Sequence, residues 1–171
     1  MPDLYTHTAL AYAVPDKWRA GIPLEAFLAG AALPDVLAYV PLKLLVALRW
    51  FVPVPNWLVH VFVPWHSPAV FALACFLLSF LFEQEKRKKI FLGLLGGSLF
   101  HLFIDLFQYQ PDGGYFVFYP FSLRTFQLGL IHADFWAVWA GGATILVLIK
   151  LFFMYSGTKQ ERNPDDSRQR L

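Results

Sequence analysis

The sequence predicts an all-α protein: a polytopic helical membrane protein with about four membrane-embedded helices. Hydrophobic residues make up 57% of the chain and charged residues only 15%, whereas soluble domains carry about 25% charged residues. The mean hydropathy of +0.49 points the same way. Two segments, residues 90–109 and 135–155, are long and apolar enough to cross a bilayer. We therefore expect an integral membrane protein.

Prolines interrupt the N-terminal half of the chain. Residues 1–20 are short and mixed, and residues 22–50 fit one span, two half-spans or a pair of interfacial helices. Pro64 and Pro68 bracket the next polar residues, so we expect a helix that begins near Ser67, with Pro68 in its first turn, and runs over residues 69–82. This helix crosses a membrane only if it extends upstream or if the bilayer thins around it.

The C-terminal half contains the two clear spans. Residues 83–89 are expected to form a charged loop, which precedes a span from Ile90 to about Phe107. A polar and aromatic segment, 108–133, has turn residues at 111–114 and leads into the span over 135–155. The charged tail is expected to be disordered. Residues 1–156 then form one membrane-embedded domain and residues 157–171 the tail.

Charge sets the expected orientation and excludes some functions. The basic run at 86–89 and the basic tail should both lie in the cytoplasm, which places His66 and Asp105 at the opposite, outer end of the spans. The net charge of +2 does not indicate nucleic-acid binding. The single Cys75 excludes an intramolecular disulfide and a cysteine-rich metal site. Membrane lipids are the expected partners, and the sequence sets no oligomeric state.

His101 and Asp105 are the most informative residues of the sequence. They lie four residues apart in an apolar span, so a helix places both side chains on one face. A carboxylate there is costly to bury without a partner, a metal ion or water. Histidine nitrogen with carboxylate oxygen suits zinc, manganese or iron(II) better than calcium or magnesium. The alternative is a polar clamp between two helices.

The chain has few other polar groups that lie in apolar stretches and could join this pair. Each has a structural alternative. His7 fits an isolated structural histidine in a helix that Thr6 caps, and Asp35 fits the cap of a following helix. His66 fits an interfacial residue beside the N-cap Ser67. Asp134 precedes a span and fits its N-cap.

Taken in order, several short motifs resemble the YdjM-type family of predicted inner-membrane metal-dependent hydrolases. They are Thr6-His7, Gly30-Ala-Ala-Leu-Pro-Asp35, His66-Ser67, Gly97-Ser-Leu-Phe-His101-Leu-Phe-Ile-Asp105 and Phe118-Tyr-Pro-Phe-Ser122, with a looser match at Arg124-Thr-Phe-Gln-Leu-Gly129 and Asp134. The resemblance covers residues 4–136. It implies a hydrolase in a prokaryotic cytoplasmic membrane, with a divalent metal, zinc or manganese in first place, held by His7, Asp35, His66, His101 and Asp105.

The chain departs from the family pattern at two places. The family commonly has Pro-Asp-x-Asp-His, whereas Val36, Leu37 and Ala38 follow Asp35 here. It also commonly has His-Arg-Gly-x-Thr-His-Ser, whereas Val61 and Phe62 replace the first two residues, and His60 is one position off. The reduced ligand set fits one metal ion in place of two, or a loss of activity.

We therefore predict that metal-activated water attacks an ester or phosphoester bond, including that of a lipid-like substrate. The site is expected near the non-cytoplasmic boundary of the membrane. Asp35 or Asp134 is the expected general base, and the aromatic segment 115–121 is expected to meet the membrane interface and admit the substrate. One rival is a non-enzymatic membrane scaffold or assembly factor with a structural His–Asp cluster. A transporter is less favoured, because the cytoplasmic halves of the spans lack ligands.

Overall fold

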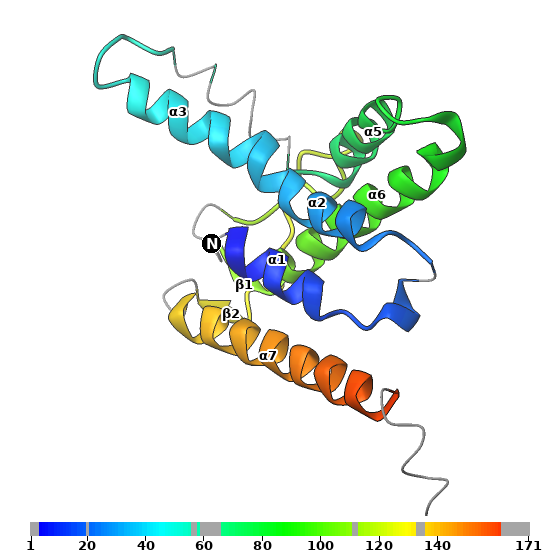
Figure 1. Ribbon diagram of the computed structural model, residues 1–171. Helices are drawn as coiled ribbons and strands as arrows, with labels where there is room; N and C mark the ends of the chain where they lie inside the picture. Colours follow the sequence, from blue (N-terminus) through cyan, green and yellow to red (C-terminus); the bar gives the residue numbers. More distant parts are fainter. Residues whose placement is uncertain are drawn as a thin grey trace, which may run out of the picture.

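The computed structural model describes residues 4–19, 21–55, 58, 66–110, 113–132 and 136–161, and the chain in these ranges is mostly helical (Figure 1). The α-helices are α1 (Leu4–Ala13), α2 (Leu24–Pro34), α3 (Val40–Leu48), α5 (Pro68–Ser79), α6 (Gln84–Leu106) and α7 (Trp136–Glu161). A 3₁₀ turn follows α1 at Asp16–Trp18, and a π-helical turn, Asp35–Tyr39, joins α2 to α3. Two short strands, β1 (Gln108–Tyr109) and β2 (Ile131–His132), pair in parallel.

Two helices are long and apolar enough to cross a membrane, among the residues that the structure describes. One is the continuous helix Leu24–Leu48, formed by α2, the π-helical turn and α3, and the other is α6. Of the three arrangements open for residues 22–50, the structure therefore has the single long helix. The apolar helices Pro68–Ser79 and Ala140–Tyr155 are shorter, so the four predicted spans are not confirmed.

Small residues let α2 and α6 cross in close contact. A Cβ atom on Gly97 would lie 2.0 Å from the Phe27 carbonyl oxygen, and one on Gly30 would lie 2.1 Å from the Leu94 carbonyl oxygen. A Cβ on Gly93 would lie 2.5 Å from that of Ala26. Gly93 and Gly97 are four residues apart, which is the spacing by which small residues bring membrane helices together. This crossing fixes α6 against α2 and so positions the residues that follow Gly97.

Pro34 explains how α2 accepts side chains from α6. Proline has no N–H, so the Gly30 carbonyl loses its usual partner four residues on. Ser98 Oγ donates to that carbonyl oxygen at 2.9 Å. The Asp35 N–H bonds to the Ala32 carbonyl and not to that of Ala31, and the Ala31 carbonyl oxygen lies 2.7 Å from His101 Nδ1 of α6. The missing helical bonds thus become contacts between the two helices.

Of the other helices, α5 and α1 pack against this pair and α7 packs against α1. α5 packs against α6, and α1 contacts α2 and α6 on one side and α7 on the other (Figure 1). The Lys150 ammonium of α7 donates to the Tyr12 and Val14 carbonyls at 2.6 and 3.3 Å, at the C-terminal end of α1. A cation is favourable at that end of a helix. Tyr5 and Thr144 add a hydrogen bond of 3.0 Å between the same two helices.

Three predicted boundaries differ from the structure. Residues 84–89 are not a loop: they form the first turns of α6, because Glu, Lys, Arg and Gln are good helix formers and a helical ion pair, Lys86–Glu83 at 2.6 Å, forms there. α5 ends at Ser79 and not at residue 82 as predicted, and the Ser79 hydroxyl donates to the Phe76 carbonyl at 2.7 Å. α7 continues past Gly157 to Glu161, so the first residues assigned to the tail are helical.

Candidate metal centre

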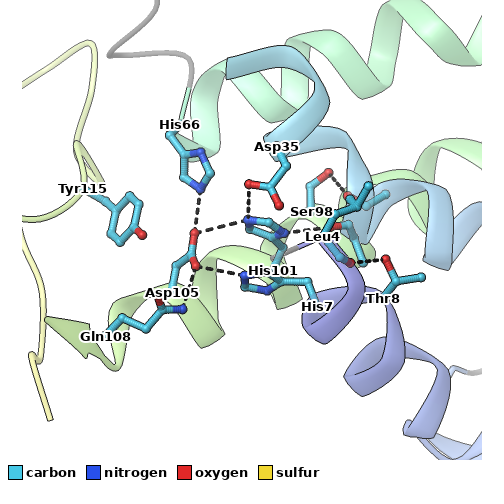
Figure 2. Close-up of polar contacts among 12 residues, drawn as sticks. Leu4, His7, Thr8, Asp35, His66, Ser98, His101, Asp105, Gln108 and Tyr115 are labelled. Carbon is cyan, nitrogen blue, oxygen red and sulfur yellow. Dashed lines mark hydrogen bonds and ion pairs between the residues drawn. The ribbon is translucent and has the colours of Figure 1, made fainter. Parts of the chain in front are cut away.

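Five imidazole and carboxylate side chains from separate parts of the chain converge near the C-terminal end of α6 (Figure 2). His7 comes from α1 and Asp35 from the π-helical turn. His66 precedes α5, and His101 and Asp105 lie on α6. All five are buried, with exposed fractions of at most 7%. The structure thus brings together the five residues that the sequence singled out as metal ligands.

Asp105 is the centre of this cluster. His66 Nε2 lies 2.7 Å and His101 Nε2 3.2 Å from its Oδ2. His7 Nε2 lies 3.1 Å from Oδ1, which also accepts a 3.0 Å hydrogen bond from Gln108 Nε2. His101 and Asp105 share one face of α6, as their spacing predicts. Three imidazoles therefore present the same nitrogen to one fully buried carboxylate.

The tautomer of His101 follows from its backbone contact. His101 Nδ1 lies 2.7 Å from the Ala31 carbonyl oxygen, and because a carbonyl can only accept, Nδ1 carries the hydrogen. The Nε2 of a neutral ring then directs its lone pair toward Asp105 Oδ2 and toward Asp35 Oδ1, which is 3.7 Å away. Lone pairs that face each other repel unless a cation or a proton lies between them. Metal-ligating histidines commonly donate their other N–H in this way.

The cluster contains more polar atoms than the protein can pair. In the described ranges, the buried side-chain atoms without a hydrogen-bond partner are His7 Nδ1, His101 Nε2, Ser67 Oγ, Gln108 Oε1 and Arg19 Nε. All but the arginine atom belong to the cluster or to residues within three positions of one of its members. Buried polar groups are nearly always paired with protein or water. Their concentration here indicates that a further polar group completes the site.

The donor atoms form two groups of three side chains that could hold a metal ion. His7, Asp35 and His101 offer ligand atoms within 4.8 Å of one another, as do His66, His101 and Asp105, and His101 belongs to both groups. Tetrahedral zinc ligands at 2.0–2.2 Å lie about 3.3–3.6 Å apart, and the four His–Asp contacts of the cluster measure 2.7–3.7 Å. The two carboxylates, when ionised, carry the charge that one divalent cation neutralises.

Gln108 and Tyr115 complete the wall of the site and were not predicted as site residues. Tyr115 is buried against Phe71, its ring centroid lies 5.0 Å from that of His66, and its hydroxyl oxygen accepts a 2.8 Å hydrogen bond from Gln110 Nε2. Burial above all, and the charge of Asp105 next, raise the pKa of the Tyr115 phenol. The hydroxyl therefore keeps its proton. The one signal in the sequence was the three-residue spacing of Gln108 from Asp105.

Several structural alternatives can now be decided. α1 begins at Leu4, before Thr6, so Thr6 is not its cap. Asp35 lies inside a continuous helix and faces His101, so it does not cap a new helix. Ser67 occupies the N-cap position of α5, but its hydroxyl makes no capping bond. Asp134, predicted as a general base or cap, lies outside the described residues.

The comparisons with known proteins agree with the membrane assignment. The family model described as YdjM inner membrane protein matches residues 4–163, a range that includes all five residues of the cluster. No curated protein and no solved structure matches the chain. Because the family model covers far more than half of the sequence, this chain belongs to the YdjM inner membrane protein family.

Proposed function

We propose that this YdjM-family protein is a membrane-bound metal-dependent hydrolase with one divalent cation, zinc or manganese, held by His7, Asp35, His66, His101 and Asp105. The observation that carries the proposal is the state of His101. Its Nδ1 hydrogen is committed to the Ala31 carbonyl, and its buried Nε2 has no hydrogen-bond partner and faces two carboxylates. A cation between these atoms satisfies all three.

The proposed reaction is the hydrolysis of an ester or phosphoester bond. A divalent ion bound here would supply Lewis acidity and a water activated at neutral pH. Asp35 is also the proposed general base, through its Oδ2 atom, because its contact with His101 at the cation site uses Oδ1. Gln108 holds the Asp105 carboxylate in place through its 3.0 Å hydrogen bond. The Tyr115 hydroxyl accepts from Gln110 and keeps its proton, which it can donate to the Asp105 carboxylate or to a substrate oxygen.

We place the site near the non-cytoplasmic boundary of the inner membrane. The basic residues at 86–89 begin α6, and the rise of a helix puts Asp105 about 24 Å beyond Lys89, close to the thickness of the hydrocarbon core. Beyond Asp105, Phe118 and Phe121 are 58% and 95% exposed. Exposed Phe side chains at this level can bury their rings in the membrane interface, and this supports a lipid-like substrate that enters from the bilayer.

The rival proposal is a membrane scaffold in which the same cluster only joins helices. A proton on His101 Nε2 would satisfy Asp35 and Asp105 without any metal ion, and the 3.2 Å contact to Asp105 is short enough for such an ion pair. A scaffold should purify without stoichiometric metal, and substitutions of its histidines should change only its folding. The two proposals therefore differ in a quantity that can be measured directly.

Metal analysis of the purified chain tests the proposal. We expect the wild-type protein to contain about one zinc or manganese ion per chain and to hydrolyse phosphoester substrates. His101→Ala should lose both the metal ion and the activity. His132→Ala is the matched control, because His132 is an exposed histidine on β2. Metal-free wild-type protein after purification without chelators, or equal activity in His101→Ala, would rule out the hydrolase.

A further inference from the structure

The N-terminus of α5 lies directly beside the metal centre. α5 begins at Pro68, two residues after His66, whose Nε2 is 2.7 Å from Asp105, and Figure 2 shows the ribbon at His66 next to the cluster. Pro68 has no N–H, and the Phe71 N–H donates to the Ser67 carbonyl at 3.0 Å. The N–H groups of Ala69 and Val70, which lie between Pro68 and Phe71, therefore have no partner inside the helix.

Ser67 supplies a second and independent sign of a missing ligand. It occupies the N-cap position with an extended backbone, φ −130° and ψ 149°, where a serine hydroxyl normally bonds an N–H of the first turn. Here the hydroxyl makes no such bond. The side chain is 0% exposed, and its Oγ has no hydrogen-bond partner among the described residues. A buried hydroxyl without a partner is costly, so a group from outside the protein is expected to bind it.

The charge around the cluster determines what this group is. The ion pairs of Asp35 and Asp105 in the described ranges involve histidines and no lysine or arginine. One divalent cation therefore neutralises the two carboxylates and leaves no charge for a bound anion. The N-terminus of α5 is then the positive pole of the site, since a helix carries about half a positive charge there. Helix N-termini with free N–H groups are established binding sites for phosphate.

We propose that Ser67 Oγ and the Ala69 and Val70 N–H groups bind a phosphate oxyanion beside the metal centre. The inference rests on the proposed hydrolase and narrows its substrate class to phosphoesters. A phosphoester carries negative charge before and during hydrolysis, so this subsite holds it from the first encounter. A carboxylic ester is neutral when it binds and gains nothing from the helix terminus at that stage.

Phosphate binding to the full chain in detergent tests the inference. We would measure metal content and the binding of radiolabelled inorganic phosphate by equilibrium dialysis, for wild type and for Ser67→Ala. We expect Ser67→Ala to weaken phosphate binding by about tenfold or more, the size of one hydrogen bond to a charged group, with unchanged metal content. Ser79→Ala is the matched control, because Ser79 lies at the opposite end of α5 and its hydroxyl already donates to Phe76. It should bind phosphate like wild type.

A second arm distinguishes the sources of the phosphate group. Phosphatidic acid in nanodiscs that displaces the labelled phosphate identifies a lipid substrate, and failure to displace it identifies a soluble phosphoester. If Ser67→Ala does not fold, Ser67→Gly replaces it, because glycine is tolerated at an N-cap and also lacks the hydroxyl.

The outcomes separate the inference from the function on which it rests. The phosphate subsite alone is overturned if the protein binds metal but does not bind phosphate, or if wild type and Ser67→Ala bind phosphate equally. Ser67-dependent phosphate binding without metal overturns the hydrolase but supports the subsite. Protein that binds neither metal nor phosphate overturns both.

Discussion

Gly97→Ala is the sharpest test of the helix crossing that positions the metal centre. The added Cβ would lie 2.0 Å from the Phe27 carbonyl oxygen and 2.6 Å from the Ala31 nitrogen, both backbone atoms. An ordinary contact begins at 3.4 Å, so α2 and α6 would have to separate by roughly 1.4 Å. His101 lies one turn beyond Gly97, and its 2.7 Å bond to Ala31 would then exceed hydrogen-bond length.

The expected loss of stability is about 1–3 kcal/mol, the usual effect of overpacking. This loss exceeds the gain of about 1 kcal/mol that alanine brings over glycine inside a helix. Metal affinity should fall by about 10- to 100-fold, as it does when the support of a ligand is removed. The assays are thermal unfolding in detergent and metal content after dialysis.

Gly96→Ala is the control for this prediction. Its Cβ would meet only the Phe27 ring, at 3.6 Å, which is an ordinary contact. The same gain in helix propensity therefore applies without a clash, and the variant should be as stable as wild type or more so, with normal metal content. If the two alanine variants unfold at the same temperature and bind metal equally, α2 and α6 do not cross as described.

Two further predictions concern the contact of α1 with α7 and the turn after α1. Lys150→Met should lower the free energy of unfolding by about 1 kcal/mol, because the ammonium group bonds to two carbonyls at the end of α1. The control is Lys88→Met, on an exposed part of α6, which should leave the unfolding temperature unchanged. The hydrogen bond from Arg19, with its charge, lowers the pKa of Asp16 below 3.8, so the stability that Asp16 adds is present above that pH and is lost as the pH falls through the lower folded value. The difference in unfolding temperature between wild type and Asp16→Asn should therefore be constant from pH 7 to 5 and shrink below about pH 4; a difference that grows on acidification would contradict this.

The elements that could be predicted are those whose signal is local. Pro68 marks the first turn of α5, and the spacing of His101 and Asp105 places both on one face of α6. The helix Leu24–Leu48 was left undecided, because its internal prolines, Pro34 and Pro41, normally break or kink a helix. Here Ser98, distant in sequence, satisfies the carbonyl that Pro34 leaves free. No local pattern reveals such a bond.

The candidate site could be predicted only in part for a similar reason. Periodicity pairs His101 with Asp105, while His7, Asp35 and His66 were selected by their residue types and by the family resemblance. The roles of Gln108 and Tyr115 depend on β1 and on the bridge between Tyr115 and Phe126. Strands of two residues and isolated bridges have no sequence periodicity, so these residues could not be placed.

The fold and the chemistry of the site depend on the same two backbone atoms. α6 donates side-chain hydrogen bonds to the consecutive carbonyls of Gly30 and Ala31, at 2.9 Å from Ser98 and 2.7 Å from His101. Two such bonds fix the rotation of α6 about its axis, and the second also fixes the hydrogen of His101 on Nδ1. Nε2 must then face Asp35 and Asp105, and it can bind a cation without losing any contact. The bonds that hold the helices together therefore leave the imidazole in the tautomer that a metal ligand requires.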